Sequence, residues 1–100
     1  MTISKTQSSF YRRLYVAYLV ARDVDNLPAI IDVTGMPRRT AQDTLAALSE
    51  LDIDCRFEPT PGKPHNIGQY VIRDWGPIDP DWLNQHAERL CKALGYPPLA

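Results

Sequence analysis

The sequence predicts an α+β fold that is mostly α, made of four helices and one β-hairpin. Apolar residues recur at helical spacing in the first half of the chain and again near its end. Gly35 and Gly95 stand directly after two of these helical stretches, where a residue with positive φ commonly ends a helix. Between these glycines, in residues 53–57 and 67–74, the apolar period changes to two, as it does in half-buried strands.

Composition and charge are those of one ordinary globular domain. The chain has 100 residues, of which 44% are hydrophobic and 23% charged, and its formal net charge is −1. This balance argues against the histone-like or polybasic-tail binding of nucleic acid that a strongly basic chain performs. The charge is uneven, because residues 1–49 carry a net +2 and residues 50–100 a net −3. A local basic face in the first half is therefore compatible with the composition.

The sequence carries no signal of a membrane or secreted protein. The most apolar stretch, residues 10–21, is interrupted by Arg12 and Arg13 and is too short to cross a bilayer. The polar residues before it lack the small-residue cleavage site of a secretory signal. Cys55 and Cys91 lie far apart in the sequence and are expected to be reduced, mostly buried thiols. We therefore expect a cytoplasmic protein without a membrane partner.

The first helix is expected to begin near Ser8 or Ser9, after a flexible leader of residues 1–8, and to run to about Asp23. Apolar side chains cover most of its circumference, so it is either central to the fold or shared with a partner chain. The residues expected to face the core are Phe10, Leu14, Ala17 and Ala21.

An aromatic stripe beside these core positions suggests a homodimer. Because the core already has another face of the same helix, this stripe is free to contact a second chain, with help from the last helix. The residues assigned to this dimer interface are Tyr11, Tyr15, Tyr18, Trp82 and Leu90.

Two further helices follow with a short turn between them. Asn26 caps a helix over residues 27–34, and Gly35 ends it. The next helix is expected to run from about Pro37 to Leu51. Its inward residues at helical spacing are Ala41, Thr44, Leu45, Leu48 and Leu51, and its outward residues are Arg38, Arg39, Gln42, Asp43 and Ala46.

The hairpin and the last helix complete the chain. The segment 59–66 holds three prolines and a glycine, so it is expected to form a stiff loop between the two strands. Asp79 caps a final helix over residues 80–94, and Gly95 stops it.

Residues 27–51, LPAIIDVTGMPRRTAQDTLAALSEL, resemble the helix-turn-helix of bacterial winged-helix DNA-binding proteins. The resemblance extends over roughly residues 8–75, and the hairpin corresponds to the wing. It implies a winged helix-turn-helix domain over 9–76, that is, a three-helix bundle plus a β-hairpin wing. Residues 77–100 add an extra C-terminal helix that packs on the domain or forms a dimer contact. The positions that carry the pattern are Ile31, Gly35, Met36, Pro37, Thr40, Ala41, Leu45 and Leu48.

The resemblance implies sequence-specific binding of duplex DNA by a bacterial transcriptional regulator. A short glycine turn sets the two helices so that the second protrudes into the major groove, which admits one helix. The base- and phosphate-contacting candidates on this helix are Arg38, Arg39, Thr40 and Gln42, and the wing candidates are Lys63, His65 and Asn66.

Three positions depart from the pattern. Pro37 stands where Ser or Thr usually caps the helix, which leaves Met36 as a poor N-cap, and Ile31 stands where a small residue is common. Asp43 stands where a basic residue is more usual and is spaced to pair with Arg39. Asp43 and the acidic second half of the chain favour the alternative, a winged helix that binds another protein and not DNA.

Catalysis has no support in the sequence. The two histidines and two cysteines lack the spacings of a zinc or metal-hydrolase site. The sequence also lacks a nucleophile elbow and a phosphate-binding glycine loop. We expect a protein that is not an enzyme and that uses no cofactor, metal or small-molecule ligand.

Overall fold

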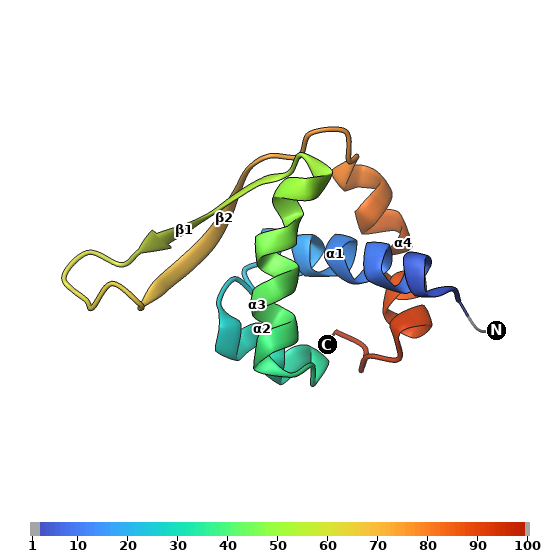
Figure 1. Ribbon diagram of the computed structural model, residues 1–100, viewed down its shortest axis with the longest axis horizontal. Coiled ribbons are helices and arrows are strands. Elements are labelled where there is room, and N and C mark those ends of the chain that lie inside the picture. Colours follow the sequence, from blue (N-terminus) through green and yellow to red (C-terminus); the bar gives the residue numbers. More distant parts are fainter. Residues whose placement is uncertain (1–2, 100) are drawn as a thin grey trace.

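The computed structural model describes residues 3–99, and its organising element is helix α1 (Lys5–Ala21). The other helices pack around α1, and the hairpin projects from this body (Figure 1). The remaining elements are α2 (Leu27–Thr34), α3 (Arg38–Ala47), a 3₁₀ turn (Leu48–Leu51), β1 (Asp54–Pro59), β2 (Gly68–Asp74) and α4 (Pro80–Leu94).

Helix α1 begins earlier than the sequence suggested. Ser4 is its N-cap: the Ser4 hydroxyl accepts a hydrogen bond from the Gln7 backbone N–H at 3.1 Å. In return the Gln7 side chain accepts from the Ser4 backbone N–H at 3.2 Å, which completes a capping box. The expected start at Ser8 or Ser9 is therefore wrong, and residues 5–8 belong to the helix and not to a leader.

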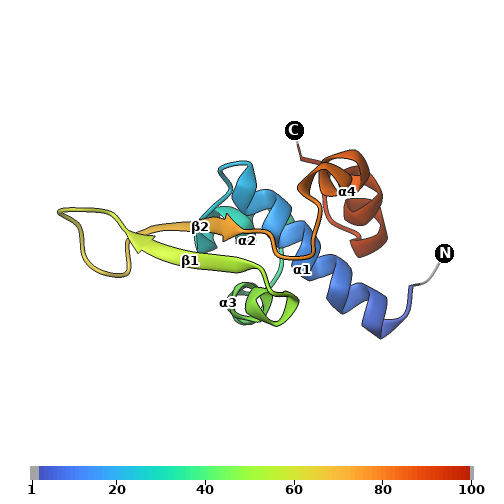
Figure 2. The same cartoon turned by 90° about the horizontal axis from the view of Figure 1, so that it is seen from above.

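Helix α1 is buried on two sides, by two separate groups of side chains. One side packs on α2, α3 and the start of the hairpin, and the other packs on α4. In Figure 2, α3 and α4 accordingly lie on opposite sides of α1. The first group centres on Val16, Ala17, Val20, Ile30, Met36, Ala41, Leu45, Leu48 and Ile53, and the second on Leu14, Tyr15, Leu19, Leu83, Leu90 and Cys91.

This double burial explains why α1 is apolar around most of its circumference, since α4 of the same chain covers its second side. Tyr15 is only 1% exposed and Leu90 is fully buried, so their assignment to a dimer interface is wrong. Phe10 and Ala21, which were expected to face the core, are exposed. The buried residues of α1 lie between positions 14 and 20. Phe10 precedes this stretch and Ala21 follows it, so both lie beyond the part of the helix that the other elements cover.

The helix-turn-helix forms as its local signals predict. The Asn26 side chain accepts from the Ala29 N–H at 2.9 Å, and Gly35 ends α2 with φ of 76°. Pro37 is the N-cap of α3, not Met36, and it supplies no side-chain hydrogen bond. Helix α3 ends at Ala47 and continues as a 3₁₀ turn to Leu51, where the prediction had a continuous α-helix.

The hairpin is antiparallel and turns its apolar side chains toward the body. Phe57 pairs with Tyr70 and Cys55 with Ile72, and the two aromatic rings meet edge to face with centroids 5.1 Å apart. The Tyr70 backbone N–H donates to the Asp25 carbonyl at 2.7 Å, which ties β2 to the loop after α1. The strands of the hairpin are thus held to the body at Tyr70, whereas its tip lies at the far end of the molecule (Figure 1).

Candidate nucleic-acid interface

The outward side of α3 is a polar row that is open to solvent. Its opposite side is buried through Ala41, Thr44 and Leu45, as predicted. Thr40 is half-buried at the edge of the row, beside α1. The exposed members are Arg38, Arg39, Gln42, Asp43 and Ala46, the five residues that the helical spacing placed outward.

The N-terminus of α3 has free backbone donors. The first hydrogen bond of this helix runs from the Ala41 N–H to the Pro37 carbonyl at 3.0 Å. Within the described chain, the N–H groups of Arg38, Arg39 and Thr40 have no acceptor, because the Pro37 side chain cannot supply one. Such donors, together with the positive end of the helix dipole, favour an anion such as a phosphate.

The two arginines at this end of α3 differ in their surroundings. Arg39 Nε lies 3.5 Å from an Asp43 carboxylate oxygen, as the spacing predicted, and both side chains are largely exposed. A pair exposed to this extent holds Arg39 only weakly, so the arginine remains available to a ligand. Arg38 forms no ion pair within the described residues, and its positive charge partly offsets the burial that raises the pKa of Tyr70 in β2.

Arg12 and Arg13 of α1 lie beside this end of α3, and sequence reasoning missed them as site residues. A groove of about 250 Å³ runs between both arginines and Thr40, Asp43 and Thr44. A second groove, of about 400 Å³, is lined by Arg12, Thr40 and the turn residues 35–37. Arg12 and Arg13 therefore add positive charge beside Thr40 on the α1 side of α3, whereas Arg38 and Arg39 line neither groove.

Neither arginine of α1 is neutralised by an acidic side chain in the described residues. The Ser9 hydroxyl accepts from the Arg13 guanidinium at 2.6 Å, and the Ser8 hydroxyl accepts from that of Arg12 at 3.5 Å. These i,i+4 contacts hold the guanidinium groups along the helix and leave their charge intact. In the sequence, Ser8 and Ser9 precede Arg12 and Arg13 by four residues, which indicates these contacts. The packing of α1 on α3, which the sequence does not show, brings the two arginines to the candidate site.

The three wing candidates, Lys63, His65 and Asn66, are exposed at the hairpin tip. The tip is an ordered turn, because the Thr60 N–H donates to the Ile67 carbonyl at 2.8 Å and the Ile67 N–H to the Pro64 carbonyl at 2.9 Å. The structure does not bring the tip beside α3, since the hairpin points away from it (Figure 1). A ligand that contacts both must therefore be long.

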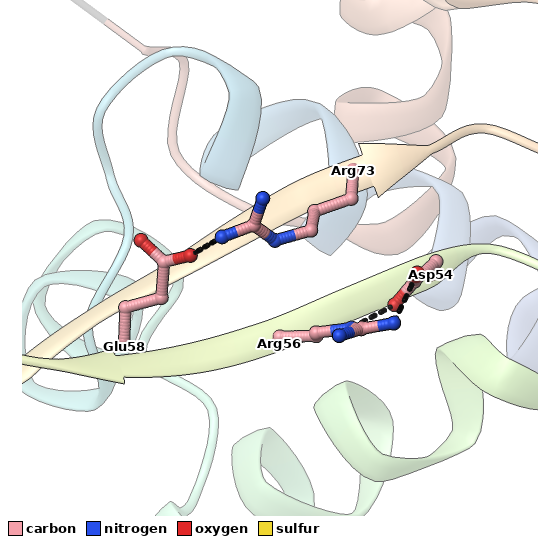
Figure 3. Close-up of polar contacts among 4 residues, drawn as sticks. All are labelled: Asp54, Arg56, Glu58 and Arg73. Carbon is pink, nitrogen blue, oxygen red and sulfur yellow. Dashed lines mark hydrogen bonds and ion pairs between the residues drawn. The ribbon is translucent and has the colours of Figure 1, made fainter.

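The outward side of the hairpin carries arginines whose charge is already compensated. Arg56 Nε lies 2.9 Å from Asp54 within β1, and Arg73 of β2 forms an ion pair with Glu58 of β1 (Figure 3). The Arg56 guanidinium lowers the pKa of the Asp54 carboxyl, so this carboxyl remains charged at neutral pH. The strands of the hairpin therefore offer little free positive charge to a polyanion.

The remaining histidine, His86, contacts Trp82 of its own helix. The His86 imidazole lies 2.8 Å from the Trp82 carbonyl through Nδ1 and stacks on the Trp82 ring. Both cysteines are free thiols. In residues 3–99 there is no cluster of three or more His, Cys, Asp or Glu side chains suited to a metal ion. No helix in this part of the chain is long and apolar enough to cross a membrane.

A helix-turn-helix followed directly by a β-hairpin, packed on one central helix, defines a winged helix-turn-helix protein. A model of the winged helix-turn-helix family matches residues 5–94, and the chain belongs to this family. The matched range includes α4, so the extra C-terminal helix is part of the unit.

The chain is also similar to the crystal structure of a DUF2131 family protein from Shewanella amazonensis SB2B. The two share 40% sequence identity with a TM-score of 0.85, over 95% of this chain and 91% of that chain. No protein with a curated description matches the chain. The fold and family expected from the sequence are thereby confirmed, and DNA is the partner that this family suggests.

Proposed function

We propose that this protein binds duplex DNA sequence-specifically by placing the N-terminal half of α3 in the major groove. One observation carries the proposal. The exposed start of α3 combines Arg38, Arg39 and Gln42 with uncapped backbone N–H groups. Arginine and glutamine are side chains that read base edges in the major groove, and free N–H groups at a helix start bind phosphate.

Each candidate has a role that follows from its chemistry and position. The guanidinium groups of Arg38 and Arg39 can each donate two hydrogen bonds to the O6 and N7 atoms of guanine. The Gln42 amide, one turn further along, can pair in the same way with adenine. Thr40 and the α1 pair, Arg12 and Arg13, line the grooves at the edge of α3 and contact the phosphates on either side.

The wing assists from a distance. Lys63, His65 and Asn66 lie at the tip of a hairpin whose strand β2 is held to the body by the hydrogen bond between Tyr70 and Asp25. A duplex that passes α3 and continues toward the tip meets these side chains at its backbone or minor groove. Because Arg56 and Arg73 are paired with carboxylates, Lys63 supplies most of the wing's attraction for phosphate.

The proposed biological role is that of a bacterial transcriptional regulator in the cytoplasm, acting as a homodimer. One small module contacts too few base pairs for a long operator, and pairing of two copies doubles the contacts. With Tyr15 and Leu90 buried, the remaining candidates for the dimer contact are Tyr11, Tyr18 and Trp82. Trp82 is 36% exposed, and the two tyrosines are half-buried.

A protein-binding winged helix is the second candidate, and the ion pairs favour it. Asp43 sits in the middle of the exposed row of α3, and Asp54 and Glu58 neutralise the arginines of the hairpin. A surface of alternating charge is suited to a protein partner, whose own charges alternate. DNA instead requires a net positive surface, which here depends on Arg12, Arg13 and Arg38.

Selection from a library of random duplexes distinguishes the two functions. DNA binding predicts that the wild-type protein enriches one sequence family. This family should have fixed guanines, which Arg reads, and a fixed adenine, which Gln reads. Arg38→Ala/Arg39→Ala should enrich none. If the wild type enriches no sequence, while a protein partner is captured equally by the wild type and by this double variant, the protein-binding candidate is correct.

A further inference from the structure

A cavity of about 320 Å³ lies between α1, α4 and the segment that follows α4. This volume is near the lower end of the roughly 300–1,000 Å³ that small-molecule sites occupy. The cavity is on the α4 side of α1, whereas α3 packs on the other side (Figure 2). Its walls are mostly apolar and include Tyr15, Tyr18, Ala87, Cys91, Tyr96 and Leu99.

The walls are held in place by contacts that do not need a ligand. Helix α4 ends at Gly95 with φ of 75°, which turns the chain back along α4. The Cys91 thiol then donates to the Tyr96 carbonyl at 3.3 Å and to the Pro97 carbonyl at 3.2 Å. Two successive prolines stiffen the segment beyond. A preformed cavity of this kind loses little entropy when a ligand enters.

Aromatic rings give the cavity its chemical preference. The Tyr15 ring lies with its centroid 5.8 Å from that of Tyr18 and 5.9 Å from that of Tyr96. These clustered rings are suited to an aromatic ligand that stacks on them or meets their edges. The Tyr15 hydroxyl, like that of any tyrosine, carries its proton at neutral pH, and burial raises its pKa further.

The charged residues that line the cavity cancel one another. Lys92 Nζ lies 3.3 Å from a Glu88 carboxylate oxygen, one turn apart on α4, and both side chains are largely exposed. The lining therefore has no net charge to attract an anion or a cation. An ionic group brought inside would lose its hydration without gaining a partner of opposite sign.

We propose that this cavity binds a small, uncharged aromatic molecule with one or two rings and one hydrogen-bond acceptor. The rings pack against Tyr18 and Tyr96, behind which Tyr15 is buried, and a tyrosine hydroxyl donates to the acceptor. No pattern in the sequence indicates this site, because its walls come from both ends of the chain and meet only in the fold. The site lies outside the surface assigned to DNA, so its occupancy does not depend on DNA binding.

Calorimetric titration with three naphthalene probes tests the proposal on the full chain. The probes are 2-naphthamide, which is neutral, 2-naphthoate, which is an anion, and 2-(aminomethyl)naphthalene, which is a cation at neutral pH. We expect saturable binding of the amide, and binding of both charged probes weaker by about tenfold or more. Failure of the amide to saturate, or equal binding of all three probes, would overturn the proposal.

A filled cavity provides the matched comparison. Ala87 is buried against the cavity, so Ala87→Met should weaken binding of the amide by about tenfold, whereas Gln85→Met, on the exposed surface of α4, should leave it unchanged. Equal binding by both variants would contradict the assignment. If Ala87→Met does not fold, the backbone N–H chemical shifts of the wild type, followed during a titration with 2-naphthamide, locate the binding site instead. Shifts centred on Ala87, Cys91 and Tyr96 support the site, and shifts centred elsewhere overturn it.

Discussion

Arg12 of α1 and Thr40 of α3 border the same two grooves, although 27 residues separate them in the chain. This neighbourhood extends the candidate surface from one helix to two. Arg12 also lines the groove that reaches the turn residues Gly35 and Pro37, where α3 begins. The proposed DNA contact therefore includes a phosphate-binding flank that the helix-turn-helix pattern alone did not indicate.

Replacing the two α1 arginines should weaken DNA binding without changing sequence preference. For Arg12→Ala/Arg13→Ala we expect a loss of affinity that is similar for all sequences, and a reduction of about 2 in the slope of log K against log salt concentration. Fluorescence anisotropy at several salt concentrations measures both. A loss confined to the preferred sequence would instead assign these arginines to base reading and contradict the phosphate role.

Removing the Asp43 carboxylate should strengthen DNA binding. Asp43→Asn frees Arg39 and deletes one negative charge from the exposed row of α3, so the dissociation constant should fall by a few-fold at low salt. Because both side chains are exposed, the free energy of unfolding should change by less than about 0.5 kcal/mol. Weaker DNA binding by this variant would indicate that Asp43 itself contacts a base, such as the amino group of cytosine.

The turn of the helix-turn-helix depends on the backbone of Gly35. A Cβ at this position meets no atom within 4 Å, so any cost of Gly35→Ala comes from its φ of 76° and not from a clash. We expect a loss of about 1–2 kcal/mol in the free energy of unfolding, measured with urea. Gly35→Asn should lose less, because asparagine tolerates this conformation better. Equal losses for the two variants would show that φ is not the cause.

Stability should fall as the pH rises from 9 to 11, in part through Cys55. Burial raises the pKa of the Cys55 thiol to about 11, so the unfolded chain releases this proton at a lower pH than the folded protein does. The folded state then holds more protons, and raising the pH favours unfolding. Between pH 7.5 and 10.5 we expect Cys55 to account for a loss of about 1–2 kcal/mol.

Urea unfolding of the wild type and of Cys55→Ala at both pH values isolates this contribution. The difference between the two proteins should shrink at pH 10.5, because the variant has no thiol to titrate. Tyr15, whose pKa is also raised by burial, acts equally in both proteins and cancels in the comparison. Burial raises the pKa of Tyr70 and an ionised Cys55 raises it further, so the comparison reports Cys55 together with this coupling. A difference that does not depend on pH would show that Cys55 titrates alike in the folded and unfolded chains.

Elements with local signals at both ends could be predicted from the sequence. Asn26 and Gly35 bound α2, and Asp79 and Gly95 bound α4, at the residues expected, because each makes its capping interaction within its own helix turn. The start of α1 was missed because Ser4, Ser8 and Ser9 are all able to cap a helix. What distinguishes Ser4 is Gln7 three residues further on, whose side-chain oxygen accepts from the Ser4 backbone N–H and completes a capping box.

Features that depend on packing between elements could not be predicted. The sequence of α1 showed that apolar side chains cover most of its circumference, but not that α4 would cover Tyr15. The same limit applied to Arg12 and Arg13, whose position beside Thr40 is set by how α1 lies against α3. The outward row of α3 was predictable, because helical spacing alone decides which residues oppose Ala41 and Leu45.

The measurement that tests the central proposal most directly is a titration of duplex DNA at two salt concentrations with a matched pair of double variants. Arg38→Ala/Arg39→Ala removes two charges from α3. Arg22→Ala/Arg89→Ala removes two exposed charges, one directly after α1 and one on α4, outside the proposed interface. We predict salt-dependent binding by the wild type and the second variant, and a loss of about tenfold or more for the first. Equal binding by both variants, or no salt-dependent binding by the wild type, would contradict DNA recognition by α3.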